Sequence, residues 1–88
     1  MLENLSKDSL GLVNYAYPGH TKIGDVIAMI VNPRTMQCCG YVPDSSPDRE
    51  RAEAAARNFK KCETSWVVVI VRVPNIILQV YYEGKLIL

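Results

Sequence analysis

The chain has 88 residues, of which 49% are hydrophobic and 22% charged, a balance typical of a globular protein and not of a disordered one. So short a chain forms one domain, residues 1–88, because too little of it would remain to build a second core. The formal net charge is +1, without the clear basic excess of most proteins that bind nucleic acid or anionic membranes, so neither kind of partner is favoured.

The first predicted elements are a short helix and a strand. Residues 1–10 carry apolar side chains at helical spacing, and Gly11 would end a helix there. Residues 12–17 place apolar side chains alternately, as a half-buried strand does. Pro18-Gly19 then predicts a turn, because proline fixes φ and glycine accepts positive φ.

Residues 23–31 fit two structures. Their apolar positions match one face of a helix, and the same run is also short enough for a buried strand. The following residues favour the strand. Asn32-Pro33-Arg34-Thr35 has proline at the second position of a β-turn, and residues 35–42 can return as a partner, so we expect a hairpin.

A helix is predicted over about residues 47–62. Ser46 suits the N-cap position, and Pro47 suits the first helical position because its missing N–H would have no partner there. One face is rich in alanine, with Phe59 as its one large side chain. Such a face lets a helix approach a sheet closely.

The second half of the chain is dominated by two predicted strands. Residues 66–73 are almost entirely apolar and mostly β-branched, which is typical of a strand in the middle of a sheet with both faces covered. Pro74-Asn75 closes that run, and residues 76–82 form the next strand before a turn at Glu83-Gly84. Leu86-Ile87-Leu88 is expected to form an edge strand held against the sheet.

These elements predict an α+β fold, with a mainly antiparallel sheet of about five strands and one helix, about 47–62, packed on one face. Uncovered, the other face would expose more apolar surface than a monomer usually carries, so the sheet either curls onto itself or is covered by another chain. We therefore expect a non-catalytic protein-binding module, an adaptor or an inhibitor that acts by binding, which forms a homodimer or binds another protein through an apolar sheet face or edge strand. The candidate interface residues are Trp66, Val68, Ile70, Tyr81 and Leu86.

Nucleic-acid binding is an alternative function. It would use basic residues of the predicted helix, namely Arg49, Arg57, Lys60 and Lys61. Acidic residues are interleaved with these basic ones, as on a solvated helix face, so the interpretation as an ordinary surface is favoured.

A cysteine-dependent enzyme or redox protein is a second alternative. The chain has three cysteines, Cys38, Cys39 and Cys62, and one histidine, His20, so a Cys–His pair is formally available. Free cysteine is usually buried, and the adjacent pair lacks the ligand spacing of a structural zinc site. Nucleotide-binding loops and nucleophile elbows are also absent from the sequence. We expect no enzymatic activity, catalytic residue, metal site or cofactor.

The cysteine count also bears on location. An odd number of cysteines cannot pair completely within one chain, which favours a reduced, cytoplasmic protein. The first residues lack the pattern of a signal peptide, and no apolar run reaches the length of about 18 residues that a membrane helix requires. A soluble protein with no membrane partner is therefore expected.

The order of hairpin, helix and two strands is broadly similar to that of roadblock and longin-type scaffold domains, which dimerise and act as adaptors. Small phage or viral proteins that disable host defences by binding can also look like this. The likeness is one of architecture and carries no motif residues, so it implies association with a protein partner and transfers no functional residue.

Overall fold

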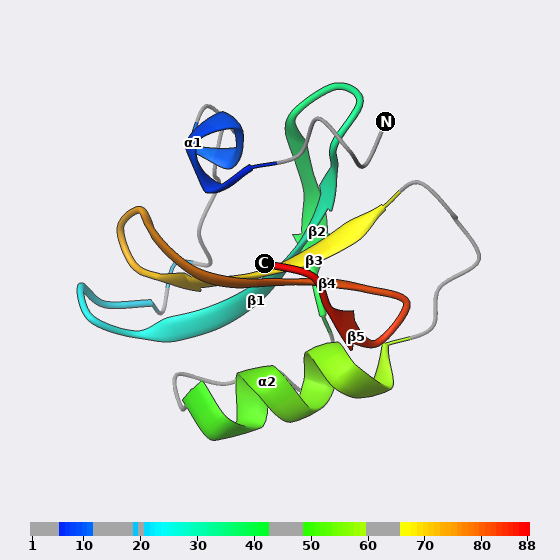
Figure 1. Cartoon of the computed structure of the whole chain (residues 1–88). Coiled ribbons are helices and arrows are strands. Elements are labelled where there is room, and N and C mark those ends of the chain that lie inside the picture. The colour runs from blue at the N-terminus through cyan, green and yellow to red at the C-terminus, as the bar shows by residue number, and fades with distance from the viewer. Residues whose placement is uncertain (1–5, 12–18, 20, 43–48, 60–65) are drawn as a thin grey trace.

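The computed structural model describes residues 6–11, 19, 21–42, 49–59 and 66–88. In chain order these residues form α1 (Lys7–Leu10), β1 (Val26–Asn32), β2 (Gln37–Tyr41), α2 (Arg49–Asn58), β3 (Val67–Arg72), β4 (Ile76–Tyr82) and β5 (Lys85–Leu86). The five strands make one antiparallel sheet, with α2 on one face and α1 on the other (Figure 1). The predicted α+β fold is confirmed, while the strand expected over residues 12–17 lies outside the described residues.

β3 is the central strand, because the sheet has the order β2-β1-β3-β4-β5. It runs antiparallel to both neighbours, with Ile70 opposite Ala28 on β1 and Gln79 on β4. Every residue from Val67 to Val71 is buried, whereas Arg72 is exposed. The prediction that this apolar run lies in the middle of the sheet with both faces covered is confirmed.

The predicted hairpin forms between β1 and β2, so the strand interpretation of residues 26–31 is confirmed and the helical one is wrong. The connecting loop is longer than the predicted turn. The Met36 amide donates to the Asn32 carbonyl at 2.8 Å, and the Asn32 side-chain oxygen accepts from the Arg34 amide at 2.9 Å. The side-chain hydrogen bond of Asn32 thus helps to fix the loop that sets the register of the hairpin.

The predicted turn between β4 and β5 is confirmed, and it packs against α2. Glu83 and Gly84 have φ values of 50° and 81°, the combination that a two-residue hairpin of type I′ requires. A Cβ atom on Gly84 would lie 2.5 Å from the main-chain oxygen of Arg57, near the end of α2. Glycine therefore serves both the turn geometry and the close approach of the turn to the helix.

α2 packs on the sheet through alanine, as predicted. Ala52 and Ala56 are fully buried in what we call the helix-side core, whose other buried members are Val26, Ala28, Val42, Val68, Ile70 and Tyr81. The helix is shorter than the predicted range of about 47–62, because Phe59 already lies outside it and its amide donates to the Ala56 carbonyl at 3.3 Å. Residues 47–48 and 60–62 lie outside the described residues.

The opposite face of the sheet carries a second cluster, the α1-side core. Its buried members are Leu10, Ile27, Met29, Val31, Val67, Val69, Val71, Val73 and Val80. Leu10 comes from α1, whose start is fixed by a capping box in which the Ser9 amide donates to the Ser6 Oγ and the Ser6 amide to the Ser9 Oγ, each at 3.0 Å. Gly11 is the C-cap, as the sequence predicted.

Candidate functional site

The structure places three of the candidate interface residues inside the chain. Val68 and Ile70 are 4% and 0% exposed, and Tyr81 is 3% exposed, because α2 covers this face of the sheet. The opposite face is buried as well in the described strands, so the expected large uncovered face is not found there. These three side chains are core residues of a single chain and do not line its surface. Trp66 is half-buried.

Leu86 is the one predicted interface residue that the structure places on the exposed surface, and it belongs to an apolar segment at the edge of the sheet. Leu86, Ile87 and Leu88 are 55%, 40% and 39% exposed, although each is aliphatic. We call residues 86–88 the edge segment. The sequence predicts Ile87 and Leu88 as part of an edge strand. The apolar pattern does not show that these side chains remain partly exposed to solvent.

Backbone hydrogen bonds to β4 hold the edge segment against the sheet. The Val80 amide donates to the Leu88 carbonyl at 3.0 Å, and the Ile87 amide donates to the Val80 carbonyl at 2.8 Å. Tyr82 and Lys85 flank the two-residue turn and therefore form a hydrogen-bonded pair. Because such pairs alternate along an antiparallel ladder, the next pair, Tyr81 and Leu86, is not hydrogen-bonded. The amide and carbonyl of Leu86 therefore point to the open side of the sheet.

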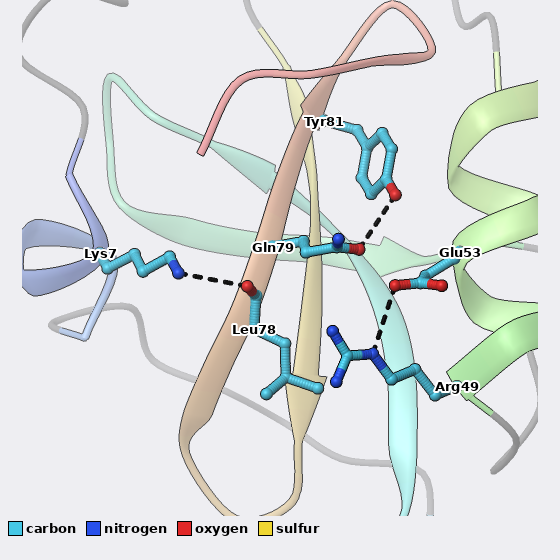
Figure 2. Close-up of polar contacts among 6 residues, drawn as sticks. All are labelled: Lys7, Arg49, Glu53, Leu78, Gln79 and Tyr81. Atoms are coloured by element: carbon cyan, nitrogen blue, oxygen red, sulfur yellow. Dashed lines mark hydrogen bonds and ion pairs between the residues drawn. The ribbon is translucent and has the colours of Figure 1, made fainter.

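The outer edge of β4 continues beyond the edge segment, and α1 occupies part of it. The Lys7 Nζ donates to the main-chain carbonyl of Leu78 at 3.2 Å, a contact between residues at opposite ends of the described chain (Figure 2). Covering an edge strand with another element is a common device against unwanted pairing. Lys7 of α1 thus occupies the main-chain carbonyl of Leu78 on the part of this edge that β5 leaves uncovered.

Polar side chains gather between β4 and α2 (Figure 2). The Tyr81 hydroxyl donates to the Gln79 Oε1 at 3.0 Å, and the Arg49 Nε donates to the Glu53 Oε1 at 3.2 Å. Burial raises the pKa of the Tyr81 hydroxyl above its usual value of 10.0, and the negative charge of Glu53 acts in the same direction, while Arg57 and Arg49 oppose them. Tyr81 thus keeps its phenolic proton to higher pH than an exposed tyrosine, and it serves as a structural hydrogen-bond donor.

The basic residues proposed for nucleic-acid binding are only partly described. Arg49 and Arg57 are exposed on α2, and Lys60 and Lys61 lie outside the described residues. Arg49 is engaged with Glu53 four residues along the same helix, and Glu50 is exposed between them. The charges on the described part of α2 are therefore mixed, without a continuous basic stripe.

The residues required for cysteine chemistry are also only partly described, since Cys62 and His20 lie outside the described residues. Cys38 is half-buried and Cys39 exposed, both on β2, and neither forms a disulfide. The Cys39 Sγ lies 3.7 Å from the main-chain oxygen of Gln37, two residues away. Within the described ranges, no three of His, Cys, Asp and Glu are grouped so that they could hold a metal ion.

Comparisons with protein-family models, with curated proteins and with solved structures gave no significant match to this chain. The similarity to roadblock and longin-type domains thus stays at the level of element order. Among the described helices, none is long and apolar enough to cross a membrane. Function is accordingly inferred from the surfaces of this chain itself.

Proposed function

We propose that this protein is a small non-catalytic protein-binding module that acts through its edge segment, Leu86 to Leu88. The observation that carries the proposal is the exposure of three consecutive aliphatic side chains, at 55%, 40% and 39%, at the edge of the sheet, where β5 ends at Leu86 and the Leu86 backbone groups face outward. Apolar side chains together with unpaired backbone groups are the features by which a sheet edge accepts a further strand.

A second copy of the chain is the proposed partner. Two identical edges can pair antiparallel about a twofold axis, so that each Leu86 exchanges its amide and carbonyl hydrogen bonds with the other. The edge segment is short and buries less area than the ~1,200 Å² of a typical stable interface. The homodimer is therefore expected to be weak and to depend on protein concentration.

Light scattering across a hundredfold range of protein concentration, with reductant present, tests this proposal. The molar mass should rise with concentration from the 9.9 kDa of the single chain toward about twice that value. Leu86→Lys should hold the mass at that of the monomer, because it places like charges opposite each other at the twofold axis.

Asn75→Lys is the matched control, since it adds the same charge at an exposed position in the turn before β4. This variant should associate like the unchanged protein. If both lysine variants behave alike, or if the unchanged protein stays monomeric at every concentration, self-pairing through the edge segment is wrong. Binding of another protein would then be sought by capture with Leu86→Lys as the comparison.

A further inference from the structure

Two turns are joined at the end of the sheet opposite the β4–β5 turn. The first comprises residues 22–25 before β1, the second residues 73–75 between β3 and β4, and together we call them the turn pair. They lie side by side at the left of Figure 1, in cyan and orange. The Gly24 amide donates to the Val73 carbonyl at 2.9 Å, and the Val73 amide donates to the Asp25 carbonyl at 2.8 Å. Within the first turn, the Asp25 amide donates to the Lys22 carbonyl at 3.0 Å. The pair of turns is therefore held in one arrangement by its own backbone.

This turn pair presents aliphatic side chains to solvent. Ile23 is 86% exposed, the highest value among the large apolar residues described, and Ile76 is 54% exposed. Pro74 between them in the second turn is also exposed. The turn at Lys22 to Asp25 requires positive φ only at Gly24, where φ is 99°, so its geometry does not call for an isoleucine at the preceding position.

Basic side chains flank these apolar ones. Lys22 and Arg72 are both exposed, and Arg72 lies directly opposite Ile76 in the sheet. The carboxylate of Asp25, in the same turn, accepts a hydrogen bond from the Lys22 amide at 2.9 Å and so is directed back onto its own turn. Within the described part of the chain the single ion pair joins Arg49 to Glu53, so neither Lys22 nor Arg72 is neutralised by a described partner.

We propose that the turn pair docks on the surface of an anionic bilayer, with Ile23 and Ile76 entering the interface and Lys22 and Arg72 contacting lipid phosphates. Aliphatic side chains that stand on rigid turn tips suit a bilayer, because the bilayer takes them up without a complementary pocket. The adjacent cations match the negative surface potential of acidic lipids. This local arrangement differs from the expectation of no membrane partner, which rested on the net charge and on the absence of a signal peptide and of a long apolar run.

Flotation of the full chain with vesicles of phosphatidylcholine, with and without phosphatidylserine, tests the proposal. The protein should bind reversibly to the mixed vesicles and much less to the neutral ones, and added salt should weaken binding. Ile23→Ser with Ile76→Ser should lower the partition coefficient about 10-fold or more, because two aliphatic side chains no longer leave water. Lys22→Gln with Arg72→Gln should lower it about 10-fold for the mixed vesicles alone.

Arg34→Gln with Arg51→Gln is the matched control, because it removes two exposed cations, one in the β1–β2 loop and one on α2, that belong neither to the turn pair nor to the edge segment. This control should leave vesicle binding within about twofold, and circular dichroism should show all three double variants folded. Absence of binding to the mixed vesicles would overturn the proposal and leave an acidic protein surface as the partner to seek. A loss in this control equal to that of Lys22→Gln with Arg72→Gln would overturn it too, since binding would then not depend on the turn pair.

Discussion

β3 and the edge segment are both runs of aliphatic residues, but β3 is buried and the edge segment is exposed to solvent. Val67 to Val71 are buried at every position, whereas Leu86 to Leu88 are between 39% and 55% exposed. The difference comes from position in the sheet. β3 has a strand on each side and a layer on each face, while β5 has a neighbour only at β4. An apolar sequence therefore does not by itself distinguish a core strand from an exposed one.

The largest contrast is expected from removing the same atoms in the two regions. Ile70→Ala should lower the free energy of unfolding by about 2–5 kcal/mol, because Ile70 is fully buried in the helix-side core and its loss leaves a cavity. Ile87→Ala should cost about 1 kcal/mol or less, since Ile87 is already 40% exposed. Denaturant unfolding of both variants measures the difference. Equal losses would contradict the assignment of one residue to the core and the other to the edge.

The second prediction concerns the turn that places the edge segment. Gly84→Ala should lower the free energy of unfolding by about 2–4 kcal/mol, since alanine at a φ of 81° costs energy and its Cβ would meet the Arg57 carbonyl oxygen at 2.5 Å. Gly24→Ala is the matched control, because its φ is 99° but no atom lies within 4 Å of the added Cβ. It should cost about 1–2 kcal/mol. If thermal unfolding gives equal costs, the contact between this turn and α2 is not tight.

The third prediction uses the raised pKa of Tyr81 in the helix-side core. The folded protein retains the phenolic proton to higher pH than the unfolded chain, so the unfolded state binds fewer protons above pH 10.0 and stability falls as pH rises from there. Tyr81→Phe should remove this part of the alkaline loss, while costing about 0.5–1.5 kcal/mol at neutral pH through the hydrogen bond to Gln79. Unfolding measured from pH 7 to 11 checks both effects. An unchanged alkaline slope in Tyr81→Phe would show that other groups cause it.

The smallest expected effect belongs to the exposed charges of α2. Glu53→Gln removes the ion pair with Arg49, whose side chain is 47% exposed, and should cost about 0.3–0.5 kcal/mol at low salt. High salt should reduce that cost, because screening weakens pairs in contact with water. The same variant should lower the pKa of Tyr81, which absorbance titration of the tyrosinate would detect. A larger cost that does not depend on salt would contradict the assignment of this ion pair to the solvent-exposed rim of the helix-side core.

Much of the fold could be predicted from local chemistry. The β-branched run at Val67 to Val71, the glycine at position 84 and the alanine face of α2 each restrict the backbone or the packing in a way that a sequence displays. The end of α2 at Asn58 could not be predicted in this way, because the residues from 59 to 62 continue an acceptable helical pattern. Helix ends depend on tertiary contacts as much as on propensity.

The candidate site was less predictable than the fold, for a physical reason. The sequence predicts Val68, Ile70 and Tyr81 as interface residues, because one helix is expected to cover the sheet only partly. In the structure α2 covers these side chains, and Leu10 of α1 packs against the opposite face. The exposure of Ile23 could not be predicted from the sequence either, since an isoleucine at this position fits the buried face of a helix or of a strand. Burial depends on which elements meet in space, and the sequence does not display those long-range contacts.

Amide hydrogen exchange followed by NMR at several protein concentrations tests the central claim most directly. We predict that the amides of Val67 to Val71 are protected at every concentration, because a single chain buries β3. The Leu86 amide should exchange quickly in dilute solution and become protected as concentration rises, when a second edge pairs with it. Protection of β3 that appears only at high concentration would show that this is wrong, because a second chain would then be needed to cover the sheet face. So would a Leu86 amide that exchanges at the same rate throughout.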